Sequence, residues 1–253
     1  MNIVVLRYDT LDSTNTAAAA QARQGADEGL CIIARQQTAG RGRHGRRWVS
    51  EPDAGLYFSI VLRPSMEPRS LPLVTLMAGV AVHDTLHEYG LRPDIKWVND
   101  VLVNEKKISG ILAEAVETPK GLAVILGIGI NVTSGSLRPE ISATATSLER
   151  ELGDKPPIDT LAEQLTRYLG YFYEMLGEPD GPRDILTNWR QRSSYFSGKS
   201  VRVTMPDGDI EGTTDGLEPN GALRVKRPDG SVAIIQAGDV QQLRSRTGQA
   251  AGD

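Results

Sequence analysis

The stretch Asp94–Thr118, "DIKWVNDVLVNEKKISGILAEAVET", decides the fold of the central part of the chain. Valine, isoleucine and leucine recur through it, and the turn-like pair Asn104–Glu105 interrupts it. Apolar runs bounded by turn residues are typical of strands, so we predict strands joined by a tight connection. A glycine-punctuated apolar run, "KGLAVILGIGINV", follows at 120–132 and predicts a further strand.

Strands and helices alternate on the N-terminal side of this stretch. Ser13, Thr14 and Asn15 are favourable N-cap residues, and the alanine-rich run after them predicts a helix at 16–24. Residues 71–90 have apolar side chains at helical spacing and end in glycine, which predicts a second helix. Strands are predicted from the apolar runs at 2–8, 29–37 and 55–64.

The character of the sequence changes toward the C-terminus. The segment Thr133–Ser147 is rich in small polar residues and is predicted to be mobile, and the runs at 156–176 and 181–193 predict helices. After Ser197, short alternating runs separated by "PDGD", "EPNG" and "RPDG" predict a small antiparallel barrel. We therefore predict a large domain at 1–196, a barrel at 197–247 and a frayed tail at 248–253.

Composition and charge exclude several classes of protein. The 253 residues are 40% hydrophobic and 24% charged, which is typical of a globular protein. A net charge of -4 argues against a broad nucleic-acid-binding surface, so any anion site must be local. The lone Cys31 cannot form an internal disulfide, which fits a reducing compartment. Because no apolar run is long enough to span a bilayer and the N-terminus lacks signal-peptide features, we predict a cytoplasmic protein that does not bind membranes.

The loop Thr38–Trp48, "TAGRGRHGRRW", here called the Arg/Gly loop, concentrates positive charge in an acidic chain. Arg41, Arg43, Arg46 and Arg47 fall within it, separated by glycines and a histidine. Glycines let backbone N–H groups approach an anion and arginines neutralise it, so this composition suits a loop that orders around phosphate. The loop lacks the "GK[ST]" ending of a P-loop. A solvated basic loop and an RNA-binding Arg/Gly segment remain open at this point.

Three further motifs place polar residues or glycines within apolar runs. In "KWVNDVLV", the residues Lys96, Asn99 and Asp100 form either a functional cluster or an ordinary Asn–Asp turn. In "NEKKISGILAE", Lys107 is either a solvated strand end or an ammonium group desolvated beside a phosphate. In "GIGINV", alternating glycines indicate either close strand packing or a ligand that lies flat against the strand. The histidines show no metal-ligand spacing, and no metal site is predicted.

The order and spacing of the motifs are more specific than any one of them. "DSTN", "QQTAGRGRHGRRW", "KWVNDVLV", "KKISGILAE" and "GIGINV" follow one another between Asp12 and Ser147, and together they closely resemble the biotin protein ligase family. The resemblance implies an α+β fold. Its catalytic domain would resemble class II aminoacyl-tRNA synthetases, with a mixed β-sheet packed by helices, and a small Src-homology-3-like β-barrel would follow.

The resemblance also implies a reaction and its participants. Members of the family activate biotin with MgATP to give biotinyl-5′-AMP and pyrophosphate, and then transfer biotin to one lysine of a carboxylase carrier domain. The implied participants are biotin as substrate, ATP and Mg²⁺ as cofactors, and a biotin carboxyl carrier protein as partner. Dimers are common in the family. Because "DSTN" begins about a dozen residues into the chain, a helix-turn-helix domain has no room before it, and we predict no DNA binding.

The resemblance assigns roles to individual residues. Those implied to bind biotin are Ser13, Thr14, Asn15, Gln37, Gly40, Arg41, Lys107, Gly110, Gly127 and Gly129. Those implied to bind ATP are Arg41, Arg43, Arg46, Trp48, Asn99, Lys107 and Asn131. Arg43, Asp100 and Lys107 are implied to act in catalysis. The family usually has proline where this chain has Val98, so the turn before Asn99 lacks a fixed φ.

Three alternatives to a biotin ligase differ from it in class or in chemistry. A lipoate or octanoyl transferase would share the fold, but the "GRGRHG" and "KWVND" blocks argue against it. An RNA-binding protein could use the Arg/Gly loop alone. A biotin sensor without catalysis is disfavoured by the presence of Arg43 and Lys107. Biotin-dependent release of pyrophosphate from ATP separates a ligase from an RNA-binding protein.

Overall fold

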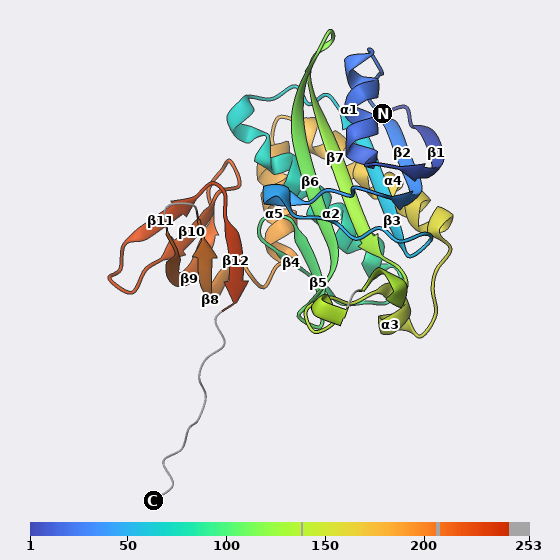
Figure 1. Ribbon diagram of the computed structural model, residues 1–253. Helices are drawn as coiled ribbons and strands as arrows, with labels where there is room; N and C mark the ends of the chain where they lie inside the picture. Colours follow the sequence, from blue (N-terminus) through green and yellow to red (C-terminus); the bar gives the residue numbers. More distant parts are fainter. Residues whose placement is uncertain (138, 206–207, 243–253) are drawn as a thin grey trace, which may run out of the picture.

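Two β-sheets of different size organise the chain (Figure 1). The computed structural model describes residues 1–137, 139–205 and 208–242. The larger sheet has seven strands in the order β1-β2-β3-β7-β6-β5-β4, and the smaller has five in the order β11-β10-β9-β8-β12. The predicted frayed tail at 248–253 and the last residues of the predicted barrel lie outside the described residues.

The larger sheet is mixed, as predicted. β1 and β2 run parallel, and the remaining neighbours pair antiparallel. The stretch Asp94–Thr118 supplies three of its strands, which confirms the prediction for that stretch. The strands are β1 (Val4–Leu11), β2 (Leu30–Gln37), β3 (Gly55–Leu62), β4 (Pro93–Lys96), β5 (Asp100–Val103), β6 (Lys106–Thr118) and β7 (Gly121–Asn131).

Two tight turns connect the three strands of that stretch. The predicted turn at Asn104–Glu105 joins β5 to β6, and both of its residues have positive φ. A second turn at 97–99 joins β4 to β5, so the turn interpretation of "KWVND" is also confirmed. The peptide bond between Trp97 and Val98 in this turn is cis. The two turns place Asp100, the first residue of β5, opposite Gly110 of β6.

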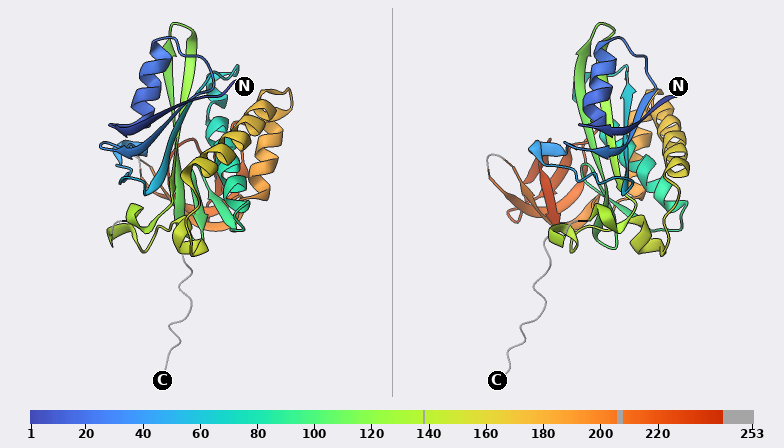
Figure 2. Two further views of the ribbon diagram at one scale, coloured as in Figure 1. Left: turned by 90° about the vertical axis from the view of Figure 1, so that its right-hand side faces the viewer. Right: turned by 45° about the vertical axis from the view of Figure 1, so that its right-hand side comes forward.

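Helices cover both faces of the larger sheet (Figure 2). On one face lies α1 (Thr14–Arg23), whose Ala18 and Ala22 pack on Ile32 of β2 in a small apolar cluster. The main core fills the other face, beneath α2 (Pro72–His87), α4 (Ile158–Gly177) and α5 (Gly181–Gln191). A short helix, α3 (Leu148–Leu152), precedes α4. No helix in the described part of the chain is both long and apolar enough to cross a membrane.

The pattern of apolar residues explains the position of the main-face helices. α4 buries Leu161, Leu165, Leu169, Phe172 and Leu176, which recur at the three- and four-residue spacing of one helix face. α2 instead buries residues around most of its circumference, because it lies between the sheet and the other two helices. Its apolar sequence is therefore that of a core helix.

The segment 133–147, predicted to be mobile, meets β6 through one isolated bridge, between Ala145 and Lys107. It contains the 3-10 turns η3 (Ser134–Ser136) and η4 (Pro139–Ile141). The Lys107 N–H donates to the Thr144 carbonyl at 2.8 Å, and the Thr146 N–H donates to the Lys107 carbonyl at 2.9 Å. Both the N–H and the carbonyl of Lys107 are thereby bonded to this segment.

The smaller sheet is antiparallel throughout and packs against the larger domain. Its strands are β8 (Ser197–Thr204), β9 (Ile210–Leu217), β10 (Leu223–Lys226), β11 (Val232–Ile235) and β12 (Asp239–Gln242). The buried Trp97 indole donates its N–H to the Gly221 carbonyl at 2.9 Å, across the junction. Val201 and Leu223 of the smaller sheet belong to the same apolar cluster as Leu76 of α2. The two sheets therefore share one continuous core.

Candidate active site

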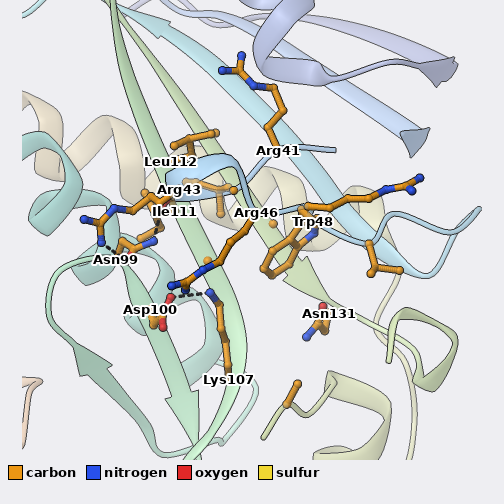
Figure 3. A pocket seen from close by; sticks show the side chains of 18 of the residues that line it. Arg41, Arg43, Arg46, Trp48, Asn99, Asp100, Lys107, Ile111, Leu112 and Asn131 are labelled. Atoms are coloured by element: carbon orange, nitrogen blue, oxygen red, sulfur yellow. Dashed lines mark hydrogen bonds and ion pairs between the residues drawn. The ribbon is translucent and has the colours of Figure 1, made fainter. Parts of the chain in front are cut away.

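A cavity of about 570 Å³ lies between the larger sheet, the Arg/Gly loop and strand β12 (Figure 3). The start of α1 lines one end of it, and β6 and β7 supply part of the wall. Residues 239–242 of the smaller sheet line it as well. Residues near the start of the chain and residues of the last described strand thus meet in one cavity.

Buried polar side chains form a hydrogen-bonded network at the α1 end of the cavity. Ser13 caps α1 by accepting from the Thr16 N–H, which places Thr14 at the first turn of the helix. Gln37 at the end of β2 accepts from the Thr14 N–H at 2.8 Å and donates to Ser50 Oγ at 2.8 Å. Because these side chains are buried and bonded to one another, they are held in one arrangement.

Asn15 lies flat across the sheet because the strand beneath it has no side chain at that point. Ser59, Gly127 and Leu112 are direct neighbours on β3, β7 and β6. The Asn15 amide fills the space above the glycine, with Oδ1 2.6 Å from Ser59 Oγ and Nδ2 2.9 Å from Glu114 Oε2. A glycine predicted to form a ligand pocket therefore makes room for a protein side chain.

Replacing Gly127 with alanine should destabilise the protein. A Cβ there would lie 2.0 Å from Asn15 Oδ1, so the amide would have to leave its partners. We expect urea denaturation to show a loss of about 1–3 kcal/mol in the free energy of unfolding. Gly170→Ala in α4 is the control, because a Cβ there meets no heavy atom within 4 Å. Equal stability of Gly127→Ala and the parent would contradict this role of the glycine.

The Trp48 indole covers two further glycines in the cavity. Gly110 of β6 and Gly129 of β7 are paired directly, and a Cβ at either position would lie 2.9 or 2.4 Å from the indole. The ammonium of Lys107 lies 5.4 Å from the ring centroid, within cation–π range. The flat contact that "GIGINV" predicts is thus made by Trp48. The buried Trp48 N–H finds no acceptor among the described residues.

Asp100 is held between two lysines at the centre of the cavity wall. Lys107 Nζ lies 2.6 Å from Oδ1, and Lys96 Nζ lies 3.0 Å from Oδ2. Burial alone raises the pKa of this carboxyl, but the two ammonium groups outweigh burial and lower the pKa below its ordinary value. Asp100 is therefore ionised at neutral pH and accepts a proton only weakly.

Arg43 extends from the Arg/Gly loop toward Asn99. Its Nη1 donates to Asn99 Oδ1 at 3.0 Å and to the Gly238 carbonyl at 3.4 Å. Burial lowers the pKa of the Arg43 guanidinium, and the nearby Asp239 and Asp100 carboxylates offset part of that effect. Since an arginine titrates far above neutrality, the side chain stays cationic. The cavity therefore holds at least three cations close to one carboxylate.

The Arg/Gly loop is a short closed hairpin attached to both sheets. The Gly42 N–H donates to the Arg46 carbonyl at 2.7 Å, which closes the hairpin. Arg46 forms an ion pair with Asp239 of β12. Arg41 forms one with Glu114 of β6 at 2.6 Å. Figure 3 shows Arg46 extending toward the Asp100–Lys107 pair and Arg43 extending toward Asn99, whereas Arg41 extends away from both.

The structure brings most of the predicted site residues to the cavity wall. Those that line it are Ser13, Thr14, Asn15, Gln37, Arg41, Arg43, Arg46, Trp48, Asn99, Asp100, Lys107, Gly110, Gly127, Gly129 and Asn131. Asn131 donates to the Thr146 carbonyl at 3.0 Å and so is held beside the segment 133–147. Gly40 is buried where the two ends of the loop meet, and a Cβ there would lie 2.5 Å from the Trp48 carbonyl oxygen. It therefore serves loop closure.

Three residues in the network around the cavity escaped prediction. Ser59 is a polar residue within the apolar run "GLYFSIVL", and that interruption was a usable signal. Glu114 ends the motif "GILAE" and looks like any outward strand residue in the sequence. Asp239 lies in a short run of the C-terminal sheet, far from every motif, so no local signal marks it. Within the described residues, no group of three or more His, Cys, Asp or Glu side chains could hold a metal ion.

The fold and the cavity define a class of protein that binds a polar small molecule beside a concentrated set of cations. Residues 8–131 match the Biotin/lipoate A/B protein ligase family, and residues 196–242 match the Biotin protein ligase C terminal domain. The chain belongs to the biotin protein ligase family, which makes it an enzyme of the ligase class.

Individual relatives agree with this assignment. The chain is 35% identical over 240 residues to the biotin–[acetyl-CoA-carboxylase] ligase of Mycobacterium tuberculosis, covering 92% of this chain and 86% of that protein. It is 33% identical over 242 residues to the bifunctional ligase/repressor BirA of Bacillus subtilis, covering 92% and 72% respectively. The biotin protein ligase of Aquifex aeolicus, solved in complex with biotin and ATP, has a TM-score of 0.81 and 29% identity, covering 95% of this chain and 99% of that one.

Proposed function

We propose that the chain converts biotin and MgATP to biotinyl-5′-AMP and pyrophosphate, and then transfers biotin to a lysine of a biotin carboxyl carrier protein. One observation carries the proposal: the buried polar network at α1 and a cluster of cations line a single cavity. A small molecule with a polar head and a carboxylate tail fits that arrangement. The similar ligase of Aquifex aeolicus holds biotin and ATP together, which supports the same pair of ligands here.

The network of Thr14, Asn15 and Gln37 is the proposed site of the biotin head group. The ureido group of biotin has a carbonyl acceptor and N–H donors, and the network offers both hydroxyl and amide groups to meet them. Ser13 caps the helix that carries the first two of these residues. The carboxylate end of biotin would then extend past Trp48 toward Lys107.

Arg43 and Lys107 are the proposed catalytic cations of the first half-reaction. A biotin carboxylate oxygen attacks the α-phosphorus, the bond from that phosphorus to the bridging oxygen breaks, and pyrophosphate leaves. Two anions must meet in this step, so a preorganised cation lowers their repulsion and stabilises the charge that develops. Each such contact is expected to contribute about 3 kcal/mol, or ~100-fold in rate. Arg46, Trp48, Asn99 and Asn131 are the proposed contacts of the nucleotide.

Asp100 is proposed to position the lysines and the incoming amine. In the second half-reaction the acceptor lysine must lose a proton before its amine attacks the biotinyl carbonyl carbon and AMP leaves. Because the pKa of Asp100 is lowered, its carboxylate is a poor general base. Its two short contacts to Lys96 and Lys107 instead support an orienting role.

The described residues offer Mg²⁺ little beyond the ligands that ATP brings. Asp100 is already engaged by two ammonium groups, and no cluster of metal-binding side chains stands beside it within the described ranges. Mg²⁺ is commonly held by substrate phosphates and water with few protein ligands. We therefore propose that the triphosphate would hold Mg²⁺, which would supply positive charge there, and that the chain itself would contribute few ligands. Lys96, Arg43 and Lys107 supply the positive charge that belongs to the chain itself.

The smaller sheet is proposed to be a Src-homology-3-like barrel that completes the nucleotide side of the site. Its five short antiparallel strands support that assignment, with a boundary to the catalytic domain near Ser197. The mixed sheet packed by helices supports a class II aminoacyl-tRNA-synthetase-like catalytic domain. Asp239 and Gly238 reach the Arg/Gly loop directly, so the barrel takes part in the site.

Asp239→Asn should weaken the use of ATP without unfolding the protein. The amide keeps the shape of the side chain but removes the charge that holds Arg46. Because Arg46 is 65% exposed, water screens the pair, and we expect the KM for ATP to rise by about two- to fivefold. Pyrophosphate release at varied ATP measures it, with Asp229→Asn in a remote turn as the control. An unchanged KM would contradict a role of the smaller sheet on the nucleotide side.

Two assays test the proposed function. The first is biotin-dependent release of pyrophosphate from ATP, and the second is transfer of labelled biotin to a carrier domain with and without ATP. Activity in both is expected. Biotin binding without pyrophosphate release would indicate a sensor, activity with lipoate in place of biotin would indicate the related transferases, and binding of RNA alone would refute the ligase.

We also propose a location, a lack of DNA binding and an oligomeric state for the enzyme. We place it in the cytoplasm, where ATP and the carboxylase carrier are found. We propose that it acts without DNA binding and that it can form a homodimer. Sedimentation at varied protein concentration tests the oligomeric state, and a single species at all concentrations would argue against the dimer.

A further inference from the structure

Glu114 joins two parts of the site although it does not line the cavity that the described residues form. Its Oε2 accepts from Asn15 Nδ2 at 2.9 Å, and its Oε1 accepts from Arg41 Nη2 at 2.6 Å. Asn15 belongs to the polar network at α1, whereas Arg41 belongs to the Arg/Gly loop. We propose that Glu114 is a positioning residue of the ligase, orienting the Asn15 amide and anchoring the loop through Arg41. This inference rests on the proposed function.

The negative charge of Glu114 sets the direction of the hydrogen bonds in the polar network. A carboxylate only accepts, so the NH₂ group of Asn15 must face Glu114 and the Leu112 carbonyl. The Asn15 carbonyl oxygen then faces Ser59 and requires its single hydroxyl proton. Ser59 Oγ also lies 2.7 Å from Thr14 Oγ1, and the Thr14 hydroxyl lies 3.2 Å from Gln37 Oε1, so the network continues from Asn15 to Gln37. Glu114, together with the Leu112 carbonyl, thereby orients the Asn15 amide within the network.

The other oxygen of Glu114 holds the loop from a point outside the reaction centre. The Arg41 side chain extends away from Asp100 and Lys107, while Arg46 extends toward them (Figure 3). Arg41 and Arg47 also pair through their backbones, so an anchor on Arg41 holds both legs of the loop hairpin. Because one carboxylate binds the network and the loop at once, movement of either one disturbs the other.

The placement of Glu114 on β6 depends on the glycine beneath Asn15. Glu114 and Leu112 lie two residues apart on one face of β6, and Leu112 is the direct neighbour of Gly127. Asn15 reaches Glu114 only because its amide can pass over that glycine, where a Cβ would lie 2.0 Å from Oδ1. An ordinary surface ion pair would need no such clearance. The contact with Asn15 therefore distinguishes Glu114 from the other charged residues of the strand.

The test compares Glu114→Ala with Glu117→Ala, an exposed glutamate on the same strand. Biotin affinity is measured by calorimetry without ATP, and hydrogen exchange of the amides of residues 38–48 is measured without any ligand. For Glu114→Ala we expect biotin to bind about tenfold more weakly and the loop amides to exchange faster. Glu114→Gln keeps an acceptor for Asn15 but removes the charge on Arg41, so loop exchange should rise more than the Kd does.

The outcomes separate this inference from the proposed function. A Glu114→Ala variant that matches Glu117→Ala in biotin affinity and in loop exchange would overturn the inference. A variant with a lower melting temperature but unchanged affinity in its folded state would overturn it too, because Glu114 would then be only structural. A parent protein that binds no biotin overturns the proposed function instead. In that case loop exchange, which needs no biotin, still decides whether Glu114 anchors the Arg/Gly loop.

Discussion

Lys107→Ala is expected to abolish formation of biotinyl-5′-AMP while the fold persists. The Lys107 ammonium lies between the Asp100 carboxylate at 2.6 Å and the Trp48 ring at 5.4 Å from its centroid. Its backbone is held by the segment 133–147, so the charge is preorganised and does not have to be recruited during the reaction. Loss of a preorganised cation where charge develops should lower the rate of biotin-dependent pyrophosphate release by at least about 100-fold.

Lys106→Ala is the matched control for this variant. Lys106 is the adjacent residue of β6 and is exposed, so its removal changes the net charge equally but leaves the cavity intact. Thermal unfolding of both variants establishes that each is folded. Near-normal pyrophosphate release by Lys107→Ala would refute its catalytic role, and equal losses in the two variants would show that net charge alone matters.

Arg43→Gly is expected to release biotinyl-5′-AMP into solution. The Arg43 guanidinium links Asn99 of the larger domain to Gly238 of the smaller sheet, and so it holds the loop across the cavity. The adenylate is a reactive mixed anhydride that must be kept from water until the acceptor lysine arrives. A hydrogen bond to a charged group is typically worth 1.5–3 kcal/mol, so free adenylate should rise roughly 10- to 100-fold.

His44→Gly is the control for the added flexibility of a glycine. His44 is exposed in the same loop and already has a φ of 55°, a conformation that glycine adopts without strain. Free adenylate is quantified by chromatography after incubation with biotin and ATP in the absence of a carrier domain. Equal release from Arg43→Gly and the parent would sink the retention role, whereas equal release from the two variants would attribute the effect to flexibility.

Much of the larger sheet and of the site could be predicted because local patterns carry that information. The turn pair Asn104–Glu105 and the apolar runs around it specify strands through their own conformational preferences. The motif "KWVND" allowed a turn or a functional cluster, and the structure shows that it is a turn whose residues also line the cavity. The two interpretations were not exclusive, since a tight turn is what brings Asn99 and Asp100 to the wall.

The rest depends on contacts between distant residues, for which a single sequence has no signal. Gly127 could be recognised as a place of close approach, but only the packing of α1 shows that Asn15 fills it. Asp239 reaches Arg46 only because the smaller sheet docks beside the loop, 193 residues away in the chain. Partner choices of this kind are made by tertiary packing, and no spacing rule within a strand or a turn reports them.

The position of β12 in the cavity wall has a consequence for biosynthesis. Ser13 to Asn15 leave the ribosome near the beginning of translation, and residues 239–242 leave it last among the described residues that line the cavity. A chain interrupted before residue 238 would lack both the Asp239 carboxylate that holds Arg46 and the Gly238 carbonyl that holds Arg43. The contacts that hold the Arg/Gly loop across the cavity are therefore complete only late in synthesis, and an adenylate made by a prematurely terminated chain would be poorly retained.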